Sequence, residues 1–137
     1  MARLETRGRA RALQALFAWD VRSEMPLDRV SALVWDDLAV LPEERAFADA
    51  LLKIVQAQGA ALDAELTEVT TNWRLERLGA IERCVLRLGA AELSQGSTPP
   101  RVIIQEAVRL AERFGSAQSA RFVNGVLDAL ARRMGLL

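Results

Sequence analysis

The apolar residues of this chain recur at helical spacing from one end to the other, and this limits the fold more than any other feature. Leu, Val, Ile and Phe return every three or four positions, the repeat that places side chains on one face of an α-helix. No segment alternates apolar and polar residues over a useful length, and the pair Asn124-Gly125 lies inside a helical pattern instead of between two strands. The sequence therefore predicts an all-α protein of six to seven helices.

Prolines, glycines and capping residues divide this pattern into separate helices. Pro42 opens the longest helix, which we expect to bend near Gly59, and Gly115 is expected to end a helix in the left-handed conformation. The expected helices are the region before Pro26, residues 27–38, residues 42–69, a helix from a cap among Thr70, Thr71 and Asn72 to about Ser94, residues 100–114, and a last helix that Ser116 or Ser119 opens.

Length and composition narrow the possible functions. A chain of 137 residues is the size of one domain and can bury a core without disulfides or metals, so we expect a single domain over residues 1–137. There is no histidine, and Cys84 is the only cysteine, which predicts no metal site, no catalytic imidazole and an inert, packed thiol. No run of apolar residues is long enough for a membrane span or follows the first arginines as a signal sequence would, which predicts a cytoplasmic protein.

The net charge of zero hides a separation of charge along the chain. Residues 1–11 carry four arginines and one glutamate, residues 20–68 carry eleven acids and four bases, and residues 70–137 carry ten bases and six acids. We therefore expect a basic surface built from both ends of the chain and an acidic surface from its middle.

The first twenty residues combine an arginine stripe with an apolar face. Arg3, Arg7, Arg11 and Gln14 are spaced by four, four and three residues and share one side of a helix, while the opposite side holds Leu13, Leu16, Phe17 and Trp19. Arginine binds phosphate oxygens with two parallel hydrogen bonds, so the stripe fits nucleic acid. An ordinary solvated helix face remains the alternative.

The run from Glu106 to Gly115, followed by Ser119 to Asp128 with its Phe122-Val123-Asn124-Gly125-Val126-Leu127-Asp128 core, resembles the signature of the NusB family of transcription antitermination factors. Three further segments agree with that family in order and spacing. They are Arg9 to Trp19, Asn72-Trp73, and the segment from Leu78 to Leu93. The resemblance covers nearly the whole chain.

The resemblance implies two small helical bundles packed on each other, no enzymatic activity and no cofactor. The family binds the boxA element of ribosomal RNA leader transcripts together with the ribosomal protein NusE, in an antitermination complex on elongating RNA polymerase. Both a monomer and a homodimer that covers the RNA surface are compatible with it. Two alternatives remain, a NusB-like RNA-binding domain that serves ribosomal RNA modification and a helical protein-binding adaptor.

The family's functional positions can be carried over residue by residue. Partner docking is implied for Phe17, which replaces a tyrosine seen in many relatives and so offers an apolar contact, and for Glu82, which could otherwise be a surface charge partner. On the helical wheel Arg9 departs from the stripe, and Phe122 is either a base-stacking residue or part of the core. The expected RNA-binding residues are Arg3, Arg7, Arg9, Arg11, Gln14, Gln118, Arg121 and Phe122.

Overall fold

The computed structural model describes residues 2–21, 24–70 and 78–137, without the side chains of residues 2 and 3. The helices are α1 (Ala2–Val21), α2 (Leu27–Leu38), α3 (Pro42–Val69), α4 (Ala80–Gln95), α5 (Pro100–Phe114) and α6 (Ala117–Arg133). No strand occurs within these described ranges, which confirms the predicted all-α class. None of the helices is both long enough and apolar enough to pass through a membrane.

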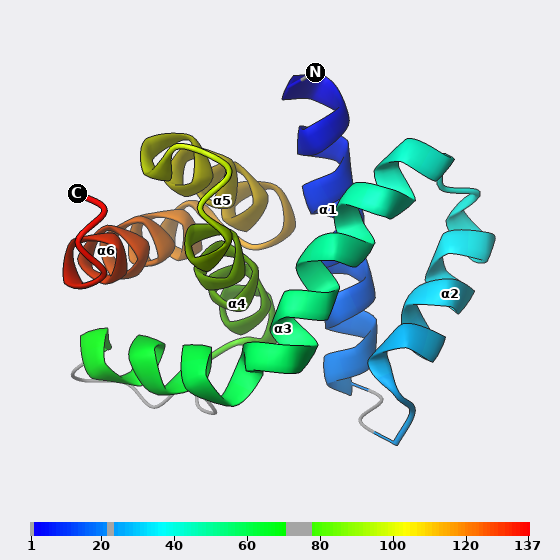
Figure 1. The fold of residues 1–137 in the computed structure, drawn as a ribbon, viewed down its shortest axis with the longest axis horizontal. Coiled ribbons are helices and arrows are strands. Elements are labelled where there is room, and N and C mark those ends of the chain that lie inside the picture. The colour runs from blue at the N-terminus through cyan, green and yellow to red at the C-terminus, as the bar shows by residue number, and fades with distance from the viewer. Residues whose placement is uncertain (1, 22–23, 71–77) are drawn as a thin grey trace.

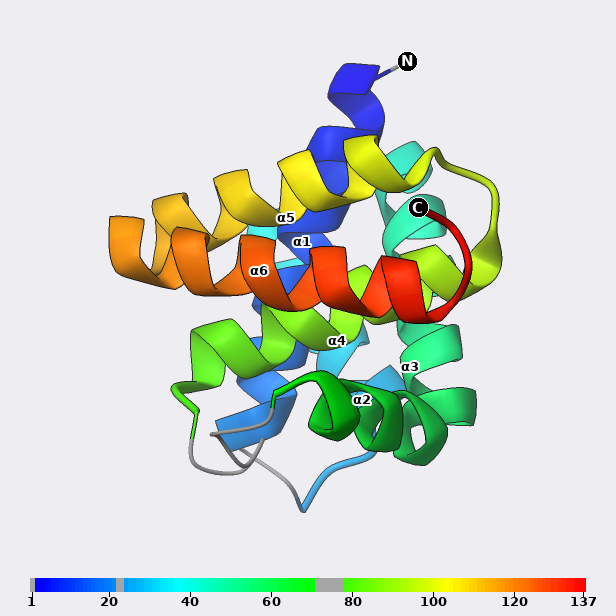
Figure 2. The same ribbon diagram turned by 90° about the vertical axis from the view of Figure 1, so that its left-hand side faces the viewer.

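The helices form two groups that meet along α1. Figure 1 shows α2 on one side of α1 and α4, α5 and α6 on the other, while α3 crosses in front of α1. In Figure 2, α5 and α6 lie side by side with α4 beneath them. Helix α3 changes direction along its length, so its second half reaches under α4 and α6 (Figure 1). A continuous apolar cluster draws buried residues from all six helices and joins the two groups.

Small residues let α1 sit in the middle of this core. Leu13 and Leu16 are 1% and 0% exposed, and the alanines around them leave room for the neighbouring helices. Gly8 faces α3, where an added Cβ atom would lie 2.7 Å from Cδ1 of Phe47. The lack of a side chain at Gly8 therefore sets how closely α1 and α3 approach each other.

The fourth helix starts later than the sequence predicts. Thr70, a proposed cap of that helix, instead closes α3, because its hydroxyl donates a hydrogen bond of 2.9 Å to the carbonyl oxygen of Leu66. That carbonyl is one of the acceptors that a helix end leaves unsatisfied. Helix α4 begins at Ala80 with Gly79 as its N-cap, and the other two proposed caps, Thr71 and Asn72, lie outside the described residues.

The turn between α5 and α6 confirms one prediction and corrects another. Ser116 is the N-cap of α6, and its hydroxyl oxygen accepts a hydrogen bond of 3.1 Å from the backbone N–H of Ser119. Gly115 has φ −121° and ψ −107°, so it is not in the left-handed region as predicted. Glycine is needed there for space, since a Cβ atom would lie 2.7 Å from the carbonyl oxygen of Ala111.

Candidate nucleic-acid interface

The arginine stripe of α1 faces the first turn of α3. Arg7 donates a hydrogen bond of 2.7 Å from Nε to Glu44, and its side chain remains 49% exposed. Arg11 donates from Nη1 to Gln14 at 2.9 Å, while its buried Nε lies 3.9 Å from Glu44. Glu44 is 4% exposed and sits in the positive first turn of α3, where a carboxylate is favoured. The side chain of Arg3 lies outside the described part of the chain.

Arg9 is not part of this surface. It is 5% exposed, and it donates from Nε and Nη2 to Glu92 of α4 at 2.8 and 2.5 Å and from Nη1 to Glu106 of α5 at 2.8 Å. Burial alone would lower the pKa of Arg9, but the hydrogen bonds and charges of Glu92 and then Glu106 outweigh it, and the pKa is raised. With its donors taken up by carboxylates, Arg9 ties α1 to α4 and α5.

A hollow of about 350 Å³ lies where the starts of α4 and α6 meet. Its lining includes Glu82 from α4 and Gln118 and Phe122 from α6, so the structure brings together a predicted partner-binding residue and two predicted RNA-binding residues. Ser119 donates a hydrogen bond to the Glu82 carboxylate. An added Cβ atom at Gly79 would clash with that same carboxylate, so this glycine makes room for it.

Within this hollow the predicted α6 residues differ in exposure. Gln118 is exposed, and so is the neighbouring Arg121. Phe122 is partly buried and packs against the core while it also lines the hollow. In this position Phe122 can belong to the core and still present part of its ring to a stacked base.

Phe17 lies on the same end of the molecule as the start of α4. Asp20, one turn after Phe17 on α1, accepts hydrogen bonds from Nε and Nη2 of Arg83 at 3.2 and 2.6 Å. Arg83 follows Glu82 directly on α4, so this pair brings the end of α1 to the start of α4. Phe17 is 37% exposed, and Val21, four residues later on the same helix face, is 61% exposed.

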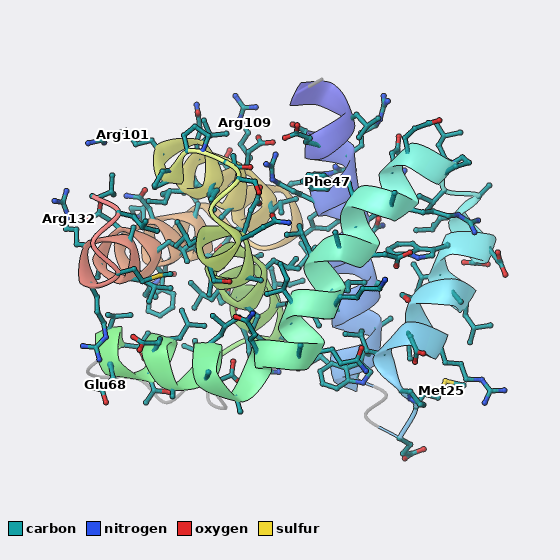
Figure 3. All side chains as sticks on the ribbon, in the orientation of Figure 1. Met25, Phe47, Glu68, Arg101, Arg109 and Arg132 are labelled. Atoms are coloured by element: carbon teal, nitrogen blue, oxygen red, sulfur yellow. The ribbon has the colours of Figure 1, made fainter. Side chains whose placement is uncertain are left out.

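The sequence interpretation missed a basic face on α5. Arg101, Gln105, Arg109 and Arg113 follow one another at four-residue spacing, and all four are exposed. Arg109 and Arg113 line a cavity of about 280 Å³ that they share with Thr6 and Arg9 of α1. The regular spacing was visible in the sequence, but only the packing of α5 beside α1 shows that the second half of this face, with Arg109, adjoins the start of α1 (Figure 3).

No group of three or more potential metal ligands occurs among the described residues. Burial, with a smaller contribution from the charge of Asp20, raises the pKa of the Cys84 thiol from 9.0 to about 12. Cys84 is therefore a packed thiol with no thiolate at neutral pH, as its sequence context predicts.

Comparisons with a family profile and with known protein sequences all identify the same family. The profile of the NusB family matches residues 6–132. The transcription antitermination protein NusB of Sorangium cellulosum is 48% identical over 130 residues, which is 93% of this chain and 91% of that protein. The protein of the same name from Solibacter usitatus is 41% identical, over 93% of this chain and 88% of its own length.

Solved structures resemble the fold over nearly the whole chain. NusB from a structure of the antitermination factors NusB and NusE in complex with double-stranded RNA superimposes with a TM-score of 0.89 at 26% identity, covering 97% of this chain and 99% of that one. NusB of T. maritima superimposes with a TM-score of 0.87 at 29% identity, covering 93% and 90%. The profile match over residues 6–132, with relatives of 41–48% identity, shows that this chain belongs to the NusB family.

Proposed function

We propose that this protein is a transcription antitermination factor. In this role it binds boxA-type single-stranded RNA of ribosomal RNA leader transcripts together with the ribosomal protein NusE, and it joins a complex on elongating RNA polymerase in the cytoplasm. The observation that carries the proposal is the similarity to antitermination proteins named NusB along nearly the whole chain. The proposed role is one of binding, without catalysis or a cofactor.

On α1 the RNA contacts are assigned to Arg7, Arg11 and Gln14, with Arg3 on the same face one turn before Arg7. Arg7 supports this best, because its half-exposed side chain is held by Glu44 at Nε alone among the described residues. Both terminal nitrogen atoms of its guanidinium can then donate to a phosphate. Glu44 would hold the guanidinium in place for that contact. Arg9 is left out of the RNA-binding set, because its side chain is enclosed by Glu92 and Glu106.

On α6 the contacts are assigned to Gln118, Arg121 and Phe122. The first two are exposed in the first turns of the helix. The exposed part of the Phe122 ring in the hollow can stack on an unpaired base, which is worth about 1–3 kcal/mol when it occurs.

NusE docking is assigned to Phe17 and Glu82. The exposed ring of Phe17 and the neighbouring Val21 offer an apolar surface at the end of α1. Glu82 offers a carboxylate whose orientation is supported by the Ser119 hydroxyl. An apolar patch beside a fixed charge is a suitable anchor for a folded protein partner.

The test is RNA binding by variants that separate Arg7 from its structural partner. We expect the parent protein with NusE to bind a boxA-type single strand more tightly than a scrambled strand, with an affinity that falls as salt rises from about 50 to 200 mM. Replacing Glu44 by Gln removes the competing charge but keeps an oxygen that can accept from Nε of Arg7, so E44Q should bind RNA at least as tightly as the parent. Adding the Arg7→Gln change should weaken that binding several-fold by fluorescence anisotropy.

The E44Q background matters because Arg7→Gln alone would leave a buried carboxylate without its strongest partner and lower stability. Parent protein that shows no RNA binding at about 50 mM salt, or binding that does not depend on salt, would contradict the function and favour a protein-binding adaptor. Equal RNA affinity of E44Q with and without Arg7 would remove Arg7 from the site.

A further inference from the structure

The exposed row on α5 has the geometry of a charged track. Arg101, Gln105, Arg109 and Arg113 follow at intervals of four residues, so successive side chains are displaced by about 6 Å along the helix. Buried Glu106 lies off the row, and the one exposed acid of α5 is Glu112. This outer face is therefore positively charged.

The second half of this row lies between the two segments assigned to RNA. Arg109 and Arg113 border a cavity whose other wall is formed by Thr6 and Arg9 near the start of α1. Arg113 is followed three residues later by Ser116, which lines the hollow that also contains Gln118 and Phe122. In Figure 2 the start of α1 rises behind the first half of α5, and the end of α5 lies beside the start of α6.

Neither arginine has a carboxylate of its own. Arg109 is 67% exposed and lies 3.5 Å from Glu106, but that carboxylate already accepts from Arg9 at 2.8 Å and from Thr6 at 2.5 Å. Arg113 is exposed, lies 4.8 Å from the ring centroid of Phe114, and makes no ion pair within the described residues. Other exposed arginines are better compensated, as Arg132 is by Asp128 at 2.9 Å.

We propose that Arg109 and Arg113 bind backbone phosphates of the RNA where it crosses from the start of α1 to the start of α6. The inference rests on the proposed RNA-binding function and adds a third contact segment to it. Two observations select RNA as the occupant, namely the charge of the two uncompensated guanidinium groups and their continuity with the RNA surfaces on both sides. Arginine forks on an exposed helix face match phosphate oxygens without reading base identity.

The experiment compares two double variants with the same loss of charge. R109Q/R113Q removes the proposed contacts, and R101Q/R132Q removes two arginines that Figure 3 shows on the side of the molecule away from α1. Affinity for a boxA-type single strand is measured from about 50 to 200 mM salt in the presence of NusE. Two lost phosphate contacts should reduce the slope of log affinity against log salt by about 1.4, because each contact on a single strand contributes about 0.7.

Over that salt range the parent should therefore lose about 7-fold more RNA affinity than R109Q/R113Q. The control R101Q/R132Q should lose as much affinity with salt as the parent does. The charge-preserving variant R109K/R113K should recover most of the slope. R113Q alone should reduce the slope by about 0.7, and it avoids any effect of Arg109 on Glu106. Thermal unfolding of each variant confirms that folded protein is compared.

The results separate this inference from the proposed function. RNA binding by the parent with an unchanged slope in R109Q/R113Q would overturn the inference and leave the function standing. Equal slope losses in both double variants would show a general charge effect and would also overturn it. A change confined to NusE binding would assign the face to protein. No RNA binding by the parent would contradict the function itself.

Discussion

At the scale of single residues, the partner decides what each arginine of α1 does. Arg9 is enclosed by two carboxylates, whereas Arg7 shares one carboxylate with Arg11 and keeps half of its surface in solvent. A guanidinium can be buried only when an opposite charge compensates it and its N–H groups donate to hydrogen-bond acceptors. Arg9 meets this condition because Glu92 binds it through two parallel hydrogen bonds.

Removing Glu92 should therefore destabilise the fold strongly. We expect Glu92→Ala to lower the free energy of unfolding by about 3 kcal/mol, because it leaves the buried Arg9 charge with only part of its compensation. Urea denaturation measures the change. The matched control is Asp128→Ala, which removes the carboxylate of an exposed pair with Arg132 and should cost no more than about 0.5 kcal/mol. Equal effects of the two substitutions would show that the buried Glu92 adds no more to stability than a carboxylate in an exposed ion pair.

Cys84 should make the fold sensitive to alkaline pH. Its pKa is near 9.0 in an exposed environment and is raised to about 12 in the fold, mainly by burial. Below pH 9 both states keep the proton and the thiol has no effect. Between pH 9 and 12 the unfolded chain loses the proton while the folded chain keeps it, so stability falls as pH rises.

The comparison is between the parent and Cys84→Ala by urea denaturation at pH 8 and pH 10. The parent should lose about 1.4 kcal/mol more than the variant between these values, which corresponds to one pKa unit of linkage. Parallel losses in both proteins would mean that the thiol titrates alike in the folded and unfolded states.

At the scale of elements, glycine controls how closely α4 and α6 pack. An added Cβ atom at Gly89 would lie 2.7 Å from Cδ1 of the fully buried Leu127, whereas one at Gly59 in α3 would meet nothing within 4 Å. Both glycines are inside helices, where alanine has the higher helix propensity. Their substitutions should therefore have opposite signs.

We expect Gly89→Ala to lower the free energy of unfolding by about 2 kcal/mol through overpacking, and Gly59→Ala to raise it by about 0.5 kcal/mol. Chemical denaturation followed by circular dichroism measures both. Stabilisation by both substitutions would show that Leu127 adjusts without cost and that helix propensity dominates at each site.

The elements also show why helix boundaries differ in predictability. The N-cap of α6 could be predicted, because the Ser116 hydroxyl bonds within three residues of its own position. The start of α4 could not. Thr70 can cap the following helix or close the preceding one, and its hydroxyl bonds backward to the carbonyl groups of Leu66 and Thr67.

At the scale of the whole molecule, two arginine clusters reinforce the apolar contact between the helix groups. One is the Arg9 cluster with Glu92 and Glu106. In the other, Asp20 of α1 accepts from Arg83 and Arg87 of α4, and Arg87 also binds Asp63 of α3 through two hydrogen bonds of 3.0 and 2.9 Å. These pairs fix the relative position of α1, α4 and the second half of α3.

The pairs also change the predicted charge map of the molecule. Carboxylates from the acidic middle of the sequence meet arginines from both basic ends, as Glu44 meets Arg7 and Glu65 meets Arg133. Uncompensated positive charge is left mainly where such a partner is missing, as at Arg113.

The all-α class, most of the helix positions and the family resemblance could be obtained from the sequence alone, because periodicity, caps and motifs are local properties of neighbouring residues. The tertiary structure decided which arginines are available to RNA. Arg9 meets Glu92 and Glu106 across 83 and 97 positions of the chain, and the α5 arginines reach the start of α1 over a similar separation. Burial and ion pairing depend on such distant neighbours, and a helical wheel contains only near ones.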